Sequence, residues 1–458
     1  MLHFPRTLRL AVSAGLVLAT SLQAQPTEPK PTPNILVIVA DDLGYADLGI
    51  TGAKDIQTPH IDSLAQNGVS FSDAYITAPV CLPSRMGIVT GRYQEAFGVQ
   101  TLGGPGHPPG IGLPTSERSL GDYLQREGYS VGLIGKWHMG WDDEFYPTNR
   151  GFDYFYGFLG GGTSYLPGTE GPLFRNDQEE PKESYLTDAF GSDAVEFVRR
   201  EQDGPWCLML CFNAVHVPME ATEEYLQRYA HIEDIGRRYY AAMTASMDDN
   251  VGRVLQALKE TGQFDDTLVF FFSDNGGAPQ NHSDNAPLRG GKYVLYEGGI
   301  RTPFLVQWPN GFKQTGTTLK EPVIAVDVVP TVLGLLEGVE PEAELHGVDL
   351  MPLLRDGQPL PDRALYWRYG PYMSAIRKGD WKLIRNGVGD NKDPAWELYN
   401  LRKDPAEAHN LAAKKPKLLR ELKREFKAWD AELPPPLFVD RRLQQGIIWW
   451  NDVALPAD

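Results

Sequence analysis

The chain has 458 residues, of which 42% are hydrophobic and 22% are charged, and its formal net charge is −17. This length is more than one small core needs and suits one large domain with an appendage, or two to three domains. The acidic balance argues against general binding to nucleic acids or to membrane surfaces, although it leaves room for a local cationic pocket.

The first 24 residues are typical of a secretory signal peptide. Arg6 and Arg9 precede an apolar run over residues 10–22, and the small Ala24 offers a cleavage point. The run is too short to span a bilayer, and no other segment is apolar enough to do so. We therefore expect a signal peptide over residues 1–24, a linker over residues 25–33, and a periplasmic or secreted protein without membrane insertion. A short membrane anchor is the less favoured alternative.

Apolar runs alternate with helical patterns in the next part of the chain. The runs that we expect to form strands are residues 34–40, 129–134, 207–212, 268–272 and 304–308. Because they are apolar on both faces, they favour parallel strands covered by helices. The helices that we expect are residues 59–67, 116–127, 185–200 and 235–260. The alternation predicts an α/β fold with a mostly parallel central sheet flanked by helices.

The pattern changes after about Pro361. Short strand-like pieces follow at residues 364–368, 373–377, 381–384 and 396–399, and a helical stretch at residues 414–429. We expect a main domain over residues 34–360 and a smaller C-terminal subdomain, an antiparallel sheet plus a helix, over residues 361–458.

Polar residues follow four of the predicted strands. Asp41-Asp42 follows the first strand, Lys136 and His138 the second, His216 the third, and Asp274-Asn275 the fourth. The carboxyl ends of parallel strands share one edge, where ligands of open α/β folds bind. Taken singly, an Asp pair is more often a turn or a helix cap, His216 a structural histidine and Lys136 a solvated lysine. The coincidence of all four at one edge favours a functional site.

The acidic part of this set has a chemistry of its own. Asp41, Asp42, Asp274 and Asn275 supply hard oxygen ligands and no thiolate, which suits calcium or magnesium better than zinc. Three crowded carboxylates would also repel one another unless a divalent ion lay among them.

The three cysteines differ in setting. Cys207 and Cys211 lie in one strand, roughly 13 Å apart, too far to form a disulfide, and we expect both in the core. Cys81 opens the segment Cys81-Leu82-Pro83-Ser84-Arg85, at a predicted helix N-terminus that favours anions. It could be a buried structural cysteine or a thiolate nucleophile.

This segment, with Thr90-Gly91-Arg92 after it, resembles the signature of type I sulfatases, in the alkaline-phosphatase-like superfamily. The resemblance extends from Asn34 to about Ala412, because further motifs occur in the family's order. They are the Asp pair, GKWH, His-x-Pro, SDNGG, LRGGKYVLYEGGIRTP around Lys292, and ELYNLRKDPAEAHNLA.

The resemblance implies a set of roles. A separate maturation enzyme would oxidise Cys81 to formylglycine (3-oxoalanine). Asp41, Asp42, Asp274 and Asn275 would bind one calcium ion, and the sulfate pocket would be lined by Arg85, Lys136, His138, His216 and Lys292. A hydroxyl of the hydrated aldehyde would attack sulfur, and the second hydroxyl would later expel sulfate. By analogy His216 would be the general acid for the leaving oxygen and His138 would assist breakdown of the hydrate.

Three alternatives stay open. A phosphatase or phosphonate hydrolase of the same superfamily is one, although phosphatases there typically use Ser or Thr with two zinc ions. A non-catalytic protein that binds sulfated glycans is another, and a thiol enzyme with unmodified Cys81 is the third.

We expect the substrate to be a sulfated sugar or polysaccharide fragment, with aryl sulfates as surrogates. Its selection would depend on the loops at residues 103–112, 141–150, 160–171 and 281–289, which are rich in Gly, Pro and polar residues. Trp141, Tyr165 and His282 are candidate sugar contacts, and each could equally be an ordinary loop residue.

Overall fold

The computed structural model describes residues 1–2, 32–102, 110–387 and 393–438. Most of the predicted signal peptide and linker, the loop segment 103–109 and the chain after residue 438 lie outside these residues. From residue 32 onward the described residues form one compact unit. No helix among the described residues is both long and apolar enough to cross a membrane.

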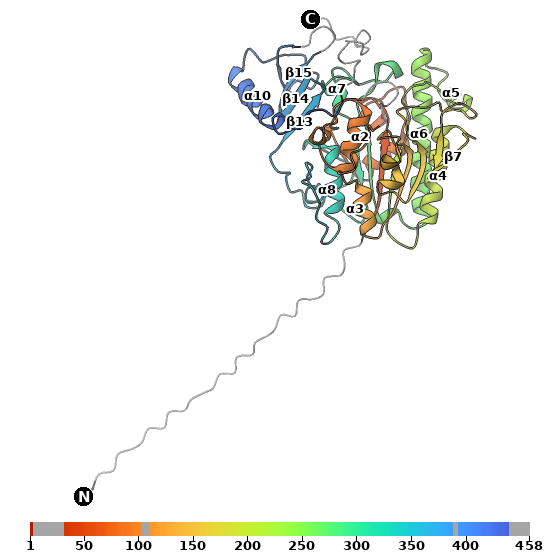
Figure 1. Cartoon of the computed structure of the whole chain (residues 1–458), viewed down its shortest axis with the longest axis horizontal. Helices are drawn as coiled ribbons and strands as arrows, with labels where there is room; N and C mark the ends of the chain where they lie inside the picture. The colour runs from red at the N-terminus through yellow and green to blue at the C-terminus, as the bar shows by residue number, and fades with distance from the viewer. Residues whose placement is uncertain (3–31, 103–109, 388–392, 439–458) are drawn as a thin grey trace. The chain divides into compact units, whose positions relative to one another are not determined.

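A ten-stranded sheet forms the centre of the described unit (Figure 1). Its strands, from one edge to the other, are β11 (Thr317–Leu319), β2 (Val69–Phe71), β10 (Phe304–Gln307), β9 (Thr267–Ser273), β1 (Asn34–Ala40), β8 (Trp206–Cys211), β4 (Ser130–Lys136), β5 (Tyr154–Phe158), β6 (Leu173–Arg175) and β7 (Gln178–Glu180). The five central strands from β9 to β5 are parallel to one another. This arrangement confirms the predicted mostly parallel sheet. A separate pair joins β3 (Ala74–Tyr75) to β12 (Val323–Ile324).

One predicted strand runs in the other direction. β10 pairs antiparallel with both β9 and β2, whereas its apolar sequence favoured a parallel strand. The expectation was wrong because burial on both faces makes any strand apolar, whatever its direction.

Helices cover both faces of the sheet. Alternate residues of β1 point to opposite sides, so Ile35 and Val37 join one core cluster and Leu36 and Ile38 join another. The first cluster includes residues of α2 (Cys81–Thr90), α3 (Leu120–Arg126), α8 (Val328–Leu333) and α9 (Met351–Asp356). The second includes residues of α1 (Pro59–Gln66), α4 (Leu186–Arg200), α5 (Glu223–Arg228) and α6 (Ile235–Glu260). Figure 1 shows α4 and α6 side by side, where they pack together.

Helix ends follow local capping chemistry. The α6 helix has the predicted bounds, and Asp234 accepts the N–H of Arg237 at its start. The predicted helix at residues 116–127 begins later, at Leu120, because Ser119 and Asp122 form a capping box there.

The C-terminal part is the predicted antiparallel sheet with a helix. Its strands are β13 (Ala364–Tyr369), β14 (Met373–Lys378), β15 (Trp381–Asn386) and β16 (Glu397–Asn400), and α10 (Pro416–Asp430) packs on them. This sheet shares core residues with the main sheet, for example Trp367 and Ile384.

A buried ion cluster also joins the two parts. The ammonium of Lys382 lies 2.9 Å from a carboxylate oxygen of Glu297, in the short helix α7 (Glu297–Ile300), and 2.9 Å from one of Glu407. All three side chains are fully buried. A second oxygen of Glu407 accepts the backbone N–H of Glu297 at 2.6 Å.

Candidate active site

The carboxyl ends of β9, β1, β8 and β4 bring the predicted residues together at one edge of the sheet. Backbone hydrogen bonds hold the segments in register just beyond the strands. The N–H of Asp41 donates to the carbonyl of Ala214 at 2.9 Å, and the N–H of Asp274 donates to that of Ala40 at 3.0 Å. Side chains separated by more than two hundred residues in sequence therefore become neighbours.

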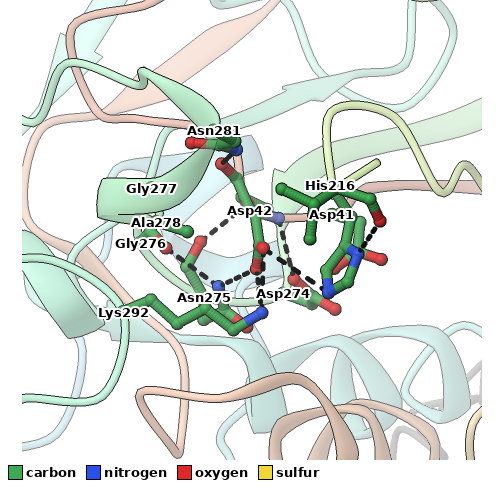
Figure 2. A network of polar contacts seen from close by, with 12 residues as sticks. Asp41, Asp42, His216, Asp274, Asn275, Gly276, Gly277, Ala278, Asn281 and Lys292 are labelled. Atoms are coloured by element: carbon green, nitrogen blue, oxygen red, sulfur yellow. Dashed lines mark hydrogen bonds and ion pairs between the residues drawn. The ribbon is translucent and has the colours of Figure 1, made fainter. Parts of the chain in front are cut away.

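Asp42 is the centre of this network (Figure 2). The ammonium of Lys292 lies 2.8 and 2.7 Å from its two carboxylate oxygens, and the Asn275 amide donates to one of them at 2.7 Å. Nε2 of His216 lies 3.7 Å away. Burial by itself raises the pKa of Asp42, but the charge of Lys292, followed by those of His216 and Lys136, lowers it to about 2.

A second layer of charges lies beneath Asp42. Nε of Arg85 donates to Asp274 at 2.7 Å, and Nη1 donates to the backbone carbonyl of Lys136 at 2.9 Å. The Lys136 ammonium pairs with Asp41. Arg85 and Lys136 are buried and do not line the pocket described below. Their side chains instead contact the carboxylates of Asp274 and Asp41, so their predicted role toward the sulfate stays a prediction.

The acidic cluster is electrically balanced by the protein itself. Three carboxylates face three cations, Arg85, Lys136 and Lys292. These cations offset part of the repulsion among the carboxylates, although burial and then the charge of Asp41 still raise the pKa of Asp274 to about 6.

A different observation fits a cation. Oδ1 of Asp41 and Oδ1 of Asn275 are buried and have no hydrogen-bond partner within the described residues. Asp41, Asp42 and His216 each offer a ligand atom within 4.8 Å of the others. Orphaned carboxylate and amide oxygens are the donors that calcium takes in proteins, so the residues present fit that ion.

Cys81 is the first residue of α2. Its side chain is 2% exposed, and every residue of that helix is buried. Burial raises the pKa of the thiol, against the opposing effect of Lys136 and Lys292. Neutral pH therefore disfavours a thiolate at this position.

A pocket of about 580 Å³ opens above this layer. Four of the predicted catalytic residues line it, Cys81, His138, His216 and Lys292. The remaining lining residues are Leu102, Trp141, Phe158, Gly160, Gly161, Gly162, Thr163, Gly171, Pro172, Val217 and Tyr293. Of the loops predicted to select the substrate, those at residues 141–150 and 160–171 reach the pocket.

The two histidines are held by their surroundings. Nδ1 of His216 lies 2.6 Å from the backbone carbonyl of Val217, so this nitrogen carries a proton and Nε2 faces Asp42. Burial, and then the charge of Lys292, lowers the pKa of His216 to about 3. His138 is 4% exposed and has a left-handed backbone conformation, with φ of 64°.

The three candidate sugar contacts lie in different places. Trp141 lines the pocket and is 42% exposed. Tyr165 is fully buried, and its hydroxyl contacts the backbone carbonyls of Asn213 and His216, so the structure gives it a supporting position instead. His282 lines a separate cavity and lies 3.5 Å from Asp234.

Sequence reasoning missed Asn281. Its buried amide nitrogen donates to the backbone carbonyls of Asp42, at 3.1 Å, and Val215, at 2.9 Å, and thereby ties the β1 end to the His216 segment (Figure 2). The only signal was its place at the start of a loop that we expected to be functional.

Known proteins resemble the chain over most of its length. The sulfatase family model matches residues 33–339, and the model named N-sulphoglucosamine sulphohydrolase, C-terminal, matches residues 291–432. Arylsulfatase A of Homo sapiens is 32% identical over 92% of this chain and 90% of its own length. N-acetylgalactosamine-6-sulfatase of Mus musculus is 30% identical over 77% of this chain and 72% of its own.

Solved structures agree in fold. The structure of Ps i-CgsB superposes with a TM-score of 0.85 at 36% identity and covers 93% of this chain and 98% of its own. The same protein was also solved with k-i-k-neocarrahexaose. The phosphonate monoester hydrolase of Agrobacterium radiobacter, at 23% identity and a TM-score of 0.63, shares the fold alone. The chain therefore belongs to the sulfatase family of the alkaline-phosphatase-like superfamily, and it is a sulfuric ester hydrolase.

Proposed function

We propose that this sulfatase removes sulfate from a sulfated carbohydrate, with an aldehyde-bearing residue made from Cys81 as nucleophile and one bound calcium ion. The observation that carries the proposal is the convergence of Cys81, His138, His216 and Lys292 on one pocket floor directly above the carboxylate cluster. A maturation enzyme acting on Cys81 and a periplasmic or secreted location belong to the same proposal.

The residues on the pocket floor have different proposed roles, which follow from their positions. Lys292 lines the pocket while its ammonium contacts Asp42, so it can meet the sulfuryl oxygens without leaving its partner. The Nδ1 contact with Val217 orients Nε2 of His216, and because Nδ1 keeps its proton, Nε2 must take up a second proton before it donates one to the leaving oxygen. His138, on the same floor, would assist release of sulfate from residue 81.

Calcium would be held by Asp41, Asp42, Asp274 and Asn275. It would supply positive charge for the sulfuryl oxygens when bound. The orphaned oxygens of Asp41 and Asn275 support this assignment.

Two observations support a sugar as the alcohol. The pocket has a volume of about 580 Å³, and the partly exposed aromatic side chain of Trp141 lines it. Among the relatives, N-acetylgalactosamine-6-sulfatase is named for a sulfated sugar, and Ps i-CgsB was solved with a neocarrahexaose.

Peptide mass spectrometry of the protein, made in a host with the maturation enzyme, tests the proposal. The proposed nucleophile is an oxidised form of Cys81. The elemental compositions of cysteine and formylglycine differ such that the conversion lowers the mass of the Cys81 peptide by about 18 Da. We expect that loss together with hydrolysis of 4-nitrophenyl sulfate and of sulfated sugars, and neither in a Cys81→Ala variant. An unmodified thiol in an active protein would refute the proposed nucleophile.

A further inference from the structure

Lys182 is a buried ammonium without a carboxylate partner. Its side chain is 5% exposed, and Nζ donates to the hydroxyl of Thr163 at 2.7 Å and to the backbone carbonyl of Glu170 at 2.8 Å. No carboxylate of the described residues lies within 4.0 Å of it. Burial lowers its pKa, and the more distant Glu220 only partly opposes this. A buried cation left without an anion is unfavourable, which suggests that a ligand supplies one.

Glu220 is the carboxylate whose charge acts on Lys182, and it accepts hydrogen bonds from other residues. One oxygen of Glu220 accepts the hydroxyl of Ser164 and the backbone N–H of Tyr165, both at 2.7 Å. Glu220 thereby fixes the chain just after Thr163, and its charge acts on Lys182 only from beyond ion-pair distance.

Thr163 carries the effect of Lys182 to the pocket. Because its oxygen accepts a hydrogen bond from Lys182, its own proton must be donated elsewhere. Within the described residues no acceptor takes that proton, and Thr163 lines the pocket. A hydroxyl polarised by an ammonium is therefore available to a substrate oxygen.

Gly171 leaves the ammonium close to the same wall. It lines the pocket, and a Cβ atom at this position would lie 3.4 Å from Nζ of Lys182. Gly171 itself therefore places no side chain in front of the ammonium, and the nearest side-chain atom to that Cβ position is the hydroxyl oxygen of Thr163, at 2.7 Å.

The position of Thr163 fits the recognition of a second group on the same sugar that carries the hydrolysed sulfate ester. Thr163 directly follows Gly161 and Gly162, which lie against His138 and His216. Lys292 lines the pocket directly, whereas Lys182 lies behind the lining residues and contacts one of them, Thr163.

We propose that Lys182 and Thr163 form a second anion-binding position, which recognises a sulfate or carboxylate group on the sugar in addition to the sulfate ester that is hydrolysed. The inference rests on the proposed function and narrows its substrate class to sugars with two anionic groups. Thr163 contacts the second group, and Lys182 polarises Thr163 and adds charge.

Steady-state kinetics of matched variants tests this assignment. The substrates are 4-nitrophenyl sulfate, the 4- and 6-monosulfates of methyl galactoside, its 2,6- and 4,6-disulfates, and a monosulfated methyl galacturonide. We expect the wild type to favour a dianionic sugar, the disulfate if the second group is sulfate and the galacturonide if it is carboxylate. For that sugar, Lys182→Met should raise KM about tenfold or more with kcat nearly unchanged. Activity on 4-nitrophenyl sulfate should not change.

Two further variants sharpen the test. Lys182→Arg keeps the charge and should restore much of the preference. Thr163→Val keeps the shape and should lose part of the preference, and the double variant with Lys182→Met should lose less than the sum of the two single losses, because the two residues are coupled by a hydrogen bond.

Two results would overturn the assignment. If Lys182→Met lost activity equally on 4-nitrophenyl sulfate and on the dianionic sugar, Lys182 would only support the loop. If the wild type preferred no dianionic sugar, the pocket would not recognise a second anionic group. Calorimetry with a Cys81→Ala protein measures the same preference as a ratio of Kd values without turnover. A wild type that hydrolyses no sulfate ester would thus refute the proposed function, while the Kd ratio would still decide on Lys182.

Discussion

A Cβ atom at Gly161 would lie 2.7 Å from Nε2 of His138. The neighbouring Gly162 is nearly as close to the other histidine, since a Cβ there would lie 3.2 Å from the His216 ring. Two consecutive glycines thus let the backbone lie directly against both imidazoles, and their lack of side chains keeps the rings in place.

Gly161→Ala should therefore reduce kcat about a hundredfold with little loss of stability, because the buried ring of His138 must shift while the fold does not. Activity on 4-nitrophenyl sulfate and thermal unfolding are the measurements. Gly204→Ala is the matched control, since no heavy atom lies within 4 Å of that Cβ position. Unchanged kcat in Gly161→Ala would show that the position of His138 is not critical.

His216→Ala should reduce the rate of hydrolysis of some substrates much more than that of others. If His216 protonates the leaving oxygen, its loss matters most for alkyl and sugar sulfates, whose alkoxide leaving groups are poor, and least for 4-nitrophenyl sulfate. A series of aryl sulfates of graded phenol pKa measures this as a steeper dependence of rate on leaving group. An equal loss across the series would contradict the role, and His138→Ala provides the comparison.

Calcium should stabilise the folded protein. At a free concentration 100 times its Kd, an ion that binds only the native state adds about 2.7 kcal/mol to the free energy of unfolding. Thermal unfolding with calcium and with chelator reports this without any assay of activity. Asn275→Ala removes one of the orphaned oxygens and should shrink the shift, whereas an unchanged shift would place the ion elsewhere.

Glu95 should make stability depend on pH. Burial raises its pKa to about 8, although the backbone N–H of Arg368 donates to it. Because the folded pKa lies above the unfolded one, the stabilising contribution is complete below about pH 4.5 and is lost as pH rises to about 8.

Glu95→Gln should therefore match the wild type near pH 4 and exceed it above pH 8, by a free energy of unfolding on the order of a few kcal/mol. Urea unfolding across this range is the measurement, with the exposed Glu337→Gln as control. A constant difference between variant and wild type at all pH values would rule out titration of Glu95.

Lys382→Met should destabilise the protein by about 3–5 kcal/mol, because it leaves Glu297 and Glu407 buried without their shared cation. Urea unfolding would measure the loss. The exposed Lys417→Met in α10 is the control and should change stability little. A loss below 1 kcal/mol would mean that the cluster contributes little to the attachment of α7 to the C-terminal part.

The sequence predicted where the site would assemble, and for a physical reason. Parallel strands place their carboxyl ends at one edge, so Asp41, His216 and Asp274 could be grouped from chain order alone. The direction of β10 could not be predicted, because apolar residues report burial and carry no information on strand direction.

The sequence also did not predict how deeply each side chain of the site is buried. Arg85 and Lys136 lie under the floor because they neutralise Asp274 and Asp41, and this pairing exists only in three dimensions. The contact between Lys182 and Thr163 likewise depends on how one loop folds back on itself, and no pattern in the sequence indicates it.

The segment that carries Lys292 is anchored from both directions along the chain. The N–H of Tyr293 donates to the carbonyl of Pro79, beside Cys81, whereas the N–H of Glu297 donates to the carboxylate of Glu407. Ribosomes make proteins from the N-terminus, so the second anchor becomes available only when translation has passed the last strand of the C-terminal sheet. A nascent or prematurely terminated chain that lacks Glu407 would therefore hold its nucleophile and its lysine in an unfinished pocket, and activity would arise only late in synthesis.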